Sequence, residues 1–410
     1  MKVLLASDSY PPLIGGGTKA THLLAQELSR RGHEVVVATL AQRGVPARER
    51  EGNVEVHRLA ASTLRLQRLS ADQTRVNAPP FPDPELTWRL SRLVARLRPE
   101  VVHVYGWIAY SCALALRGRH IPLVLSARDY GNVCALRTLY RTDNRQCEGP
   151  EALKCLRCSR REYGTVKATI AVSGVGTGKW LLRRRIGALH SVSTFVEQMM
   201  ARHLLSSEQV PHIVLPDFRQ ELKQLEISPE WERRLPDVPF ILYVGALRRV
   251  KGVPLLLRAY EALAEPPPLV LIGPAAPDEP LSYPTGVTVI RNAPYSLVLH
   301  AWDRSLFGVA PSLWPEPLGN VVHEAMSRGR AVIGTRPGGH EDMIVHGETG
   351  LLVPAGDINA LVDALLLLIE DEELRSRMGA AASTKTDEFT ADRVVPRFES
   401  LYRALVGASE

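Results

Sequence analysis

The first forty residues, MKVLLASDSYPPLIGGGTKATHLLAQELSRRGHEVVVATL (1–40), decide the fold class. Lys2–Ala6 and Glu34–Leu40 are continuous apolar runs without alternation, which is typical of strands that are buried on both faces. Between them, apolar residues recur at helical spacing in Thr18–Arg31, and Gly32 ends the predicted helix. The stretch therefore predicts a strand–loop–helix–strand unit of a parallel, doubly wound α/β sheet.

The same pattern continues along the chain and then starts again. Further buried strands are predicted at Val54–Leu59, Val101–Val104, Leu123–Ser126, Ile186–Ser191 and His212–Leu215. A charged stretch near Pro216–Pro239 interrupts the pattern. Strands are then predicted at Phe240–Gly245, Leu269–Ile272, Val287–Ile290, Leu306–Ala310, Ala331–Gly334 and Leu351–Val353. We expect two Rossmann-like domains, residues 1–217 and 238–388, facing each other across a cleft, with a terminal helix (389–410) packing back on the first.

Composition and charge limit the class of protein. The 410 residues are 45% hydrophobic and 23% charged, as in globular proteins. The longest mostly apolar stretch, Val101 to Leu116, is shorter than the ~20 residues of a membrane span, and the opening residues read as a strand rather than a signal peptide. The sequence therefore predicts a cytoplasmic protein.

The net charge of +6 comes mostly from arginine, with clusters at 157–161 and 183–185. These clusters are either a solvated basic surface or a surface that attracts anionic lipid or a phosphorylated acceptor. Peripheral association with the inner face of a membrane therefore stays open. Nucleic-acid binding is not expected, because no recognised binding module accompanies the charge.

The most informative stretch for chemistry is Pro311–Gly329, PSLWPEPLGNVVHEAMSRG. Pro315 and Pro317 are expected to hold Glu316 outside a helix that starts near Gly319. The free backbone N–H groups of such a helix start form a site for a diphosphate. Taken alone, two glutamates eight residues apart are also common in a capping loop followed by a surface helix.

This stretch and its surroundings resemble glycosyltransferase family 4, whose members are retaining enzymes of the GT-B fold. The resemblance rests on PSxxxEPxG, EAM, G-x-AVIGT, RPGGHEDMI and HGETGLLVPAGD in that order, on VGALRRVKG, and on Leu361–Ala380 as a late amphipathic helix. It implies transfer of a sugar from a UDP-, GDP-, ADP- or dTDP-linked donor to a hydroxyl group. The acceptor would be a glycan, a lipid-linked saccharide or a small-molecule glycoside.

The resemblance also implies roles for individual residues. Glu316 would contact the hydroxyls of the donor sugar, and Glu324 the ribose. Lys251 would neutralise the diphosphate as it leaves. The phosphates would be held by the helix start (Leu318, Gly319 and Asn320). No covalent nucleophile is needed in the same-face mechanism usually proposed for this family.

Three positions depart from the family pattern. Ala246 stands where an arginine is usual, so Arg248, or alternatively Arg249, would supply the missing cation. Arg128 stands where a histidine near the donor sugar is usual, which makes it a third candidate catalytic residue beside Glu316 and Lys251. A buried Arg128 needs an anionic partner, either Asp129 or a carboxylate or phosphate of a substrate. Asp342 replaces the usual glutamate of the GG-loop.

Glycines mark a second predicted phosphate contact. Gly15, Gly16 and Gly17 follow the first strand and permit close approach of the backbone to phosphate. The GVGTGK stretch at 174–179 lacks the spacing of a phosphate-binding P-loop. The chain also has no D-x-D motif, so we expect no catalytic divalent metal.

Four of the five cysteines cluster in an insertion at about 131–163, and Cys155 and Cys158 form a C-x2-C pair. The predicted ligands of a structural zinc are Cys134, Cys147, Cys155 and Cys158. Free thiols or disulfides are the alternatives. Cys112, in an apolar helix, is expected to lie in the core. Insertions of this kind occur in some family members and would lie on the acceptor side.

Other functions are less well supported. An epimerase of this architecture would normally lack the PSxxxEPxG block, and a glycogen-type phosphorylase would need a pyridoxal lysine. A catalytically weak binding or partner subunit remains the alternative, because the usual arginine and histidine are replaced at Ala246 and Arg128.

Overall fold

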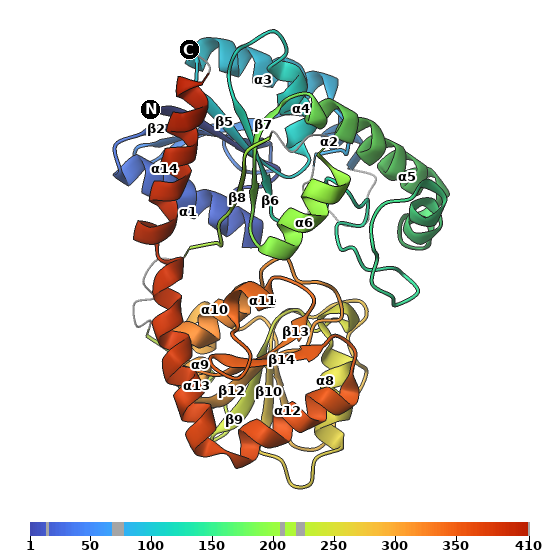
Figure 1. Ribbon diagram of the computed structural model, residues 1–410, viewed down its shortest axis with the longest axis vertical. Helices are drawn as coiled ribbons and strands as arrows, with labels where there is room; N and C mark the ends of the chain where they lie inside the picture. The colour runs from blue at the N-terminus through green and yellow to red at the C-terminus, as the bar shows by residue number, and fades with distance from the viewer. Residues whose placement is uncertain (14–15, 68–77, 206–209, 219–225, 409–410) are drawn as a thin grey trace. The chain divides into compact units, whose positions relative to one another are not determined.

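The computed structural model describes residues 1–13, 16–67, 78–205, 210–218 and 226–408. The chain forms two compact units (Figure 1). The N-terminal unit comprises Met1–Gln220 and Ala391–Glu410, and the C-terminal unit comprises Glu221–Thr390. Each unit contains one twisted sheet covered by helices, and each is described by itself.

The sheet of the N-terminal unit has the order β3-β4-β2-β1-β5-β6-β7-β8. Its strands are β1 (Lys2–Ser7), β2 (Glu34–Leu40), β3 (Arg48–Glu51), β4 (Val54–Leu59), β5 (Val101–Tyr105), β6 (Leu123–Ala127), β7 (Ile186–Ser191) and β8 (His212–Val214). All neighbours pair in parallel except β3, which pairs antiparallel with β4 at the edge. The sequence pattern missed β3, because its residues, RERE, are all polar.

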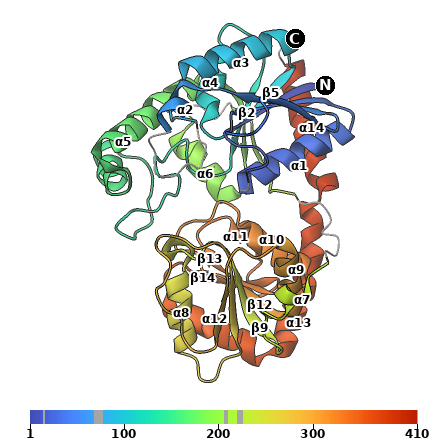
Figure 2. The same ribbon diagram turned by 180° about the vertical axis from the view of Figure 1, so that it is seen from behind.

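Helices cover both faces of this sheet. The helices are α1 (Gly16–Arg30), α2 (Ser62–Gln67), α3 (Pro84–Leu97), α4 (Ile108–Ala115), α5 (Ala152–Arg183), α6 (Thr194–His203) and α14 (Ala391–Gly407). Apolar side chains of α1 and α14 form one core with alternate residues of β1 and β2, and both views show these two helices side by side (Figures 1 and 2). Helices α3 and α4 lie on the opposite face.

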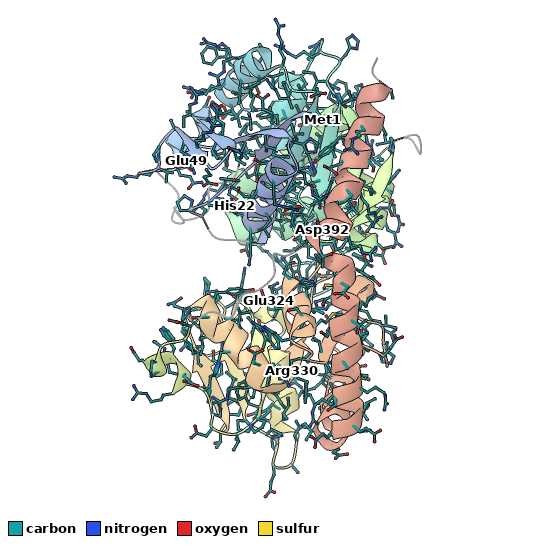
Figure 3. All side chains as sticks on the ribbon, turned by 90° about the vertical axis from the view of Figure 1, so that its left-hand side faces the viewer. Met1, His22, Glu49, Glu324, Arg330 and Asp392 are labelled. Atoms are coloured by element: carbon teal, nitrogen blue, oxygen red, sulfur yellow. The ribbon has the colours of Figure 1, made fainter. Side chains whose placement is uncertain are left out.

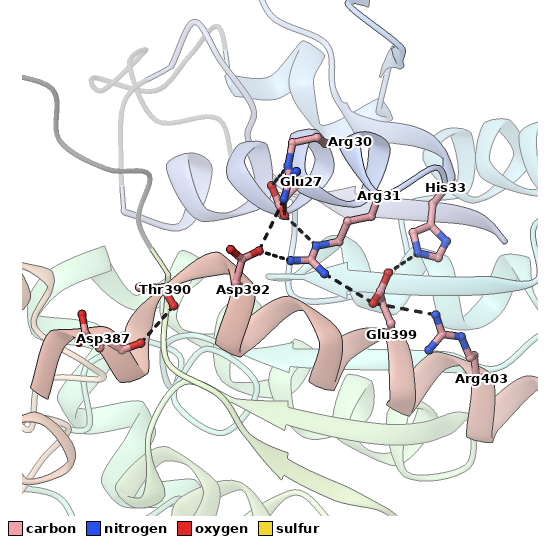
Figure 4. A network of polar contacts seen from close by, with 9 residues as sticks. All are labelled: Glu27, Arg30, Arg31, His33, Asp387, Thr390, Asp392, Glu399 and Arg403. Carbon is pink, nitrogen blue, oxygen red and sulfur yellow. Dashed lines mark hydrogen bonds and ion pairs between the residues drawn. The ribbon is translucent and has the colours of Figure 1, made fainter.

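The terminal helix α14 is fastened to the N-terminal unit by polar contacts as well (Figure 4). The Arg31 guanidinium lies 2.6 Å from Asp392 Oδ1, and His33 Nε2 lies 2.7 Å from Glu399 Oε1. In the core, the Tyr402 hydroxyl and His103 Nδ1 share a hydrogen bond of 2.5 Å. The last helix is therefore part of the fold of the N-terminal unit.

The C-terminal unit has an all-parallel sheet with the order β11-β10-β9-β12-β13-β14. Its strands are β9 (Phe240–Val244), β10 (Leu269–Ile272), β11 (Val287–Ile290), β12 (Ser305–Ala310), β13 (Val332–Arg336) and β14 (Gly350–Pro354), each within two residues of its predicted ends. Its helices include α8 (Val253–Glu261), α9 (Tyr295–Arg304), α10 (Asn320–Ser327), α12 (Ile358–Glu370) and α13 (Glu372–Lys385). Helices α8 and α12 share one apolar core with the sheet.

The late helix expected at Leu361–Ala380 is two helices instead. Asp371 lies between α12 and α13 with extended backbone, and its Oδ1 accepts the backbone N–H of Leu374 over 2.8 Å. This N-cap starts a new helix. In the part of the chain that the structure describes, no helix combines the length and apolar character needed to cross a membrane.

Candidate active site

The C-terminal unit has one point at which the strand order reverses. The chain runs from β9 outward to β10 and β11 and then returns to the other side of β9 as β12. In open α/β sheets, ligands bind outside the carboxyl ends of the strands at such a point. The loop after β9 carries Lys251, and the loop after β12 carries Glu316, so the topology brings these two candidate residues to one edge.

These two loops are tied to each other by their backbones. The backbone N–H of Leu313 donates to the Val250 carbonyl over 2.9 Å. Gly252 has a φ of +79°, and a Cβ there would lie 1.8 Å from the Pro311 carbonyl oxygen. Only glycine fits this conformation and this contact. The close approach fixes the position of Lys251 beside the second loop.

Glu316 is buried, with 6% of its surface exposed, and its Oε1 atom accepts three hydrogen bonds. The donors are Lys251 Nζ, Ser312 Oγ and Trp314 Nε1, each at 2.6 Å. Burial alone would raise the pKa of this carboxyl, but Lys251, His340 and Ser312 together hold it below its ordinary value. The site therefore contains a charged carboxylate paired with an ammonium group.

The loop after β13 supports Glu316 from behind. The backbone N–H of Gly339 donates to the Glu316 carbonyl over 2.7 Å. A Cβ on Gly339 would lie 2.3 Å from the Pro317 carbonyl oxygen, so the glycine permits the two loops to touch. The GG pair of the RPGGHEDMI stretch therefore positions the glutamate that precedes α10.

His340, the residue after the GG pair, is fully buried under the start of α10. Its Nδ1 accepts the backbone N–H of Thr335 over 3.1 Å, which places the ring proton on Nε2. This Nε2 has no hydrogen-bond partner among the described residues, and a Cβ on Gly319 would lie 2.5 Å from it. Burial lowers the pKa of His340 to about 4; Glu316 opposes the shift and Lys251 adds to it. The ring is therefore neutral near pH 7.

Helix α10 presents its N-terminus at the same edge. Gly319 is its N-cap, in the left-handed conformation, and Leu318 before it is buried. Glu324 lies more than a turn into the helix (Figure 3), where its Oε1 accepts the Tyr295 hydroxyl over 3.2 Å. The first-turn amides thus follow Glu316 directly, while Glu324 is held by α9.

Arg248 lies in the loop after β9, where its guanidinium forms an ion pair with Asp278. Its Nε lies 3.2 Å from Asp278 Oδ1, and its side chain is 37% exposed. The backbone N–H of Arg249 donates to the same carboxylate. The structure therefore brings Lys251 and Glu316 together but leaves Arg248 paired with Asp278.

Arg128 lies in the N-terminal unit, directly after β6. Its guanidinium forms an ion pair with Asp217 and lies 5.6 Å from the Tyr105 ring centroid, with 13% of the side chain exposed. The suggestion that Asp129 serves as the partner of Arg128 is wrong. Asp129 instead pairs with Arg137, whose Nη2 lies 2.6 Å from Asp129 Oδ2. A small pocket adjoins Arg128, Asp217 and His190.

The predicted glycines of the N-terminal unit lie at the start of α1. Gly16 is the first residue of this helix, two residues before the expected start at Thr18, while Gly15 lies outside the described residues. A Cβ on Gly17 would meet no atom within 4 Å. The packing of the unit itself therefore does not require glycine at position 17.

Sequence reasoning missed Asp8, which ends up at the point where the strand order of the N-terminal unit reverses. Asp8 follows β1 and accepts the backbone N–H groups of Ile108 (2.7 Å) and Trp107 (3.0 Å) at the start of α4. Burial raises its pKa to about 6, although Arg137 opposes the shift. The only signal was its place at the end of the first strand. Ser312, Trp314 and His340 were also missed, although all three lie inside motifs that had been singled out.

The four cysteines of the insertion are free thiols in a region of turns followed by the start of α5. In the described residues, no group of three or more His, Cys, Asp or Glu side chains is arranged to hold a metal ion. The expected zinc site is therefore not formed in this structure. Cys112 is buried in α4, as predicted.

The buried state of His340 predicts a pH dependence of stability. The unfolded chain protonates this histidine near pH 6.5, whereas the folded chain does not until about pH 4. The contribution of the neutral His340 to the free energy of unfolding is therefore fully present above about pH 6.5 and decreases as the pH falls toward 4. At pH 5 the loss is about 2 kcal/mol. His340→Asn retains an acceptor for the Thr335 N–H but cannot be protonated.

We expect His340→Asn to reduce the difference in thermal unfolding between pH 7.5 and pH 5. The exposed His120 provides the matched control, because His120→Asn removes an imidazole that is free in solvent. Equal pH dependence in the wild type and in His340→Asn would show that the imidazole is not held neutral in the folded protein.

Two family models match the chain. The glycosyl transferase 4-like domain matches residues 15–213, and the glycosyl transferases group 1 domain matches residues 228–385. Among curated relatives, the chain is 25% identical to the N-acetyl-alpha-D-glucosaminyl L-malate synthase of Bacillus anthracis over 98% of this chain and 97% of that protein. It is also 25% identical to the D-inositol 3-phosphate glycosyltransferase of Corynebacterium glutamicum (strain R), over 98% and 96%.

Among solved structures, the fold is similar to that of the sucrose-phosphate synthase of Thermosynechococcus elongatus. The TM-score is 0.74 at 20% identity, with 99% of both chains covered. Since the two family models together span most of the chain and both curated relatives align along nearly all of it, the chain belongs to glycosyltransferase family 4, as a GT-B enzyme that transfers a sugar from a nucleotide-sugar donor to an acceptor.

Proposed function

We propose that the C-terminal unit binds the nucleotide-sugar and that the reaction retains the configuration of the sugar. The observation that carries the donor site is the contact of Lys251 with Glu316, 2.6 Å apart, at the reversal point of the sheet and directly before α10. Retention is proposed because the members of family 4 are retaining enzymes. The ammonium group lies where a diphosphate at the helix N-terminus would need a counter-charge. The buried carboxylate is an acceptor for sugar hydroxyls.

In this proposal, donor binding rearranges the ion pair. Lys251 turns from Glu316 toward the diphosphate, and Ser312 and Trp314 still donate to the carboxylate after the ammonium has left. As the bond between the sugar and the diphosphate breaks, negative charge grows on the leaving group, and Lys251 stabilises that charge. The acceptor hydroxyl attacks from the same face, so no side chain is needed as a covalent nucleophile.

The remaining contacts with the donor are proposed from where the other candidate residues lie relative to Lys251 and Glu316. The backbone amides at the start of α10 hold the diphosphate (Leu318, Gly319 and Asn320), and Glu324 binds the ribose hydroxyls. Arg248 reaches the diphosphate only by leaving Asp278, with which it is paired. In the N-terminal unit, Gly16 and Gly17 are proposed to let the backbone approach a phosphate.

The N-terminal unit is proposed to select the acceptor. By their names, the two curated relatives act on different small acceptors, one on malate and the other on inositol 3-phosphate. Both of these acceptors carry an anionic group beside a hydroxyl. An acidic or phosphate-bearing acceptor would suit Arg128 in this chain, provided that Arg128 exchanges Asp217 for the substrate anion.

A thermal-shift screen with UDP-, GDP-, ADP- and dTDP-sugars tests the donor assignment. A donor at 100 times its dissociation constant stabilises the protein by ~2.7 kcal/mol. The same donor should be hydrolysed slowly, and brief EDTA treatment should leave this hydrolysis unchanged. Activity that EDTA abolishes and Mg²⁺ or Mn²⁺ restores would refute the metal-independent mechanism, and the absence of a shift with any donor would refute the donor site.

A structural zinc in the cysteine insertion remains a proposal. It is supported by backbone N–H groups that point at sulfur: those of Leu136, Thr138 and Leu139 at Cys134, that of Glu151 at Cys155 and that of Thr142 at Cys158. Such donors stabilise thiolates. Cys147 is also near enough to Cys134 and Cys155 to raise their pKa, in addition to the larger effect of burial. Metal binding would require these sulfurs to converge.

We expect the purified full-length chain to contain about one zinc ion. Cys158→Ser should remove the zinc, whereas Cys112→Ser, in the core of α4, should keep it. Elemental analysis of the three proteins measures this directly. Zinc-free protein in which all four insertion thiols react freely in the native state would refute the proposal.

A further inference from the structure

Helix α5 carries the whole excess charge of the protein. It contains seven lysines and arginines and one glutamate, a formal charge of +6, which equals the net charge of all 410 residues. The rest of the chain is therefore neutral overall. A concentration of charge on one helix produces a local potential that a net charge spread over the whole surface would not produce.

The same helix gathers exposed apolar side chains. Eleven large hydrophobic residues are exposed in the described parts of the chain, and five of them belong to this one helix: Leu153, Tyr163, Val166, Ile170 and Trp180. Single exposed apolar residues are normal on a protein surface, but a group within 32 residues is not. The exposed apolar residues and the excess of basic residues therefore belong to the same helix.

The geometry of α5 separates its two faces. After a break at Gly164, which has a φ of 73°, one stripe packs inward, and Gly178 lies against the Tyr110 ring of α4. The inward stripe consists of Ala168, Ala171, Val175, Gly178 and Leu182, all buried. Val166, Ile170 and Trp180 lie on the opposite side at helical spacing, with Ser173 and Thr177 between them.

Exposed cations lie on the segment of α5 before the break at Gly164, beside the start of the outward stripe at Lys167, and after its end at Arg184. We define the α5 ridge as Arg157, Arg160, Arg161, Val166, Lys167, Ile170, Trp180 and Arg184, all of which are exposed. At its end, the Arg184 guanidinium lies 3.7 Å from the centre of the Trp180 ring. Figure 1 shows α5 at the outer edge of the N-terminal unit.

The chemistry of the ridge favours one occupant. A second copy of the chain would bring two strongly positive helices together, which like-charge repulsion opposes. Aliphatic side chains and a tryptophan between arginines and lysines suit the boundary between lipid headgroups and acyl chains. Arginine and lysine near an anionic bilayer are each attracted by its surface potential.

We propose that the α5 ridge docks the enzyme on the surface of an anionic lipid bilayer. The cations contact lipid phosphates, and Val166, Ile170 and Trp180 insert into the interface. The inference concerns the N-terminal unit alone. It does not depend on the donor site proposed for the C-terminal unit.

Flotation of the full-length chain with vesicles tests this docking. The protein should float with an equal mixture of phosphatidylcholine and phosphatidylglycerol at low salt, but not with phosphatidylcholine alone. High salt should release it, because screening weakens the attraction. Reversing four cations, in Arg157→Glu, Arg160→Glu, Arg161→Glu and Lys167→Glu together, should weaken binding by at least about 500-fold. Trp180→Ser leaves the net charge unchanged and should still weaken vesicle binding, because it removes an apolar side chain that inserts into the interface.

A matched control distinguishes the effect of the cations of the α5 ridge on vesicle binding from the effect of the net charge of the protein. Arg258, Arg377, Arg393 and Arg397 are exposed residues outside the ridge, and changing all four to glutamate alters the net charge by the same amount. This control should still float, and both quadruple variants should keep donor hydrolysis, which shows that they fold. The proposal is overturned if both quadruple variants lose binding equally, if the ridge variant floats like the wild type, or if the wild type ignores anionic vesicles. A dimer that Ile170→Ser dissociates would assign the ridge to a second copy instead.

Discussion

Lys251→Ala is expected to slow turnover by about 10²–10³-fold while changing donor affinity much less. The ammonium group lies beside Glu316 and before α10. In the proposed mechanism it stabilises the charge that develops on the leaving diphosphate. An interaction that strengthens in the transition state lowers kcat, whereas one that is equal in both states changes only KM. Initial rates against donor concentration, together with a binding titration, separate the two effects.

The same substitution should also change the pH profile. Lys251 is the largest of the influences that hold the pKa of Glu316 down against its burial. Without Lys251 this pKa rises, so a larger fraction of Glu316 is protonated at a given pH, and the residual activity should recover as the pH increases. Arg258→Ala, which removes an exposed positive charge at the end of α8, is the matched control and should behave like the wild type. Near-wild-type turnover in Lys251→Ala would exclude it from the reaction.

The meeting of Lys251 and Glu316 was predictable because the strand order places both of their loops at one edge. Continuous apolar strands and the restart at Phe240 identified the two sheets, and the reversal point follows from such a topology. The hydrogen bonds of Ser312 and Trp314 to Glu316 were not predictable in the same way. Side-chain directions in a loop bounded by prolines depend on its folded path and not on a repeating period.

Side-chain ion pairs between residues far apart in the sequence were the hardest feature to predict. Arg128 and Asp217 are 89 residues apart and follow β6 and β8, which lie on either side of β7. The sequence neighbour, Asp129, was the obvious candidate, but adjacent side chains at the end of a strand point in different directions. Asp129 accordingly contacts Arg137.

Arg128→Ala is expected to destabilise the N-terminal unit by about 3–5 kcal/mol, because it removes the cation that forms an ion pair with the Asp217 carboxylate, whose side chain is 9% exposed. Replacing both partners by apolar residues, Arg128→Met with Asp217→Leu, should restore most of the stability, since no buried charge then remains unpaired. Urea unfolding followed through the transition of the N-terminal unit measures both effects. Equal losses in the single and double variants would show that the two side chains do not act as a pair.

The double variant then separates a structural role of Arg128 from substrate recognition. Arg128 Nε has no hydrogen-bond partner among the described residues, and the pocket beside it also contains His190 and Phe398. If Arg128 recognises an acidic or phosphate-bearing substrate, the stable double variant should retain donor hydrolysis but show a KM for the anionic acceptor raised by about tenfold or more, the effect of losing one charge-assisted hydrogen bond. Unchanged Michaelis constants in a protein of restored stability would assign Arg128 to the ion pair alone, because a guanidinium that binds substrate cannot be removed without a loss of affinity.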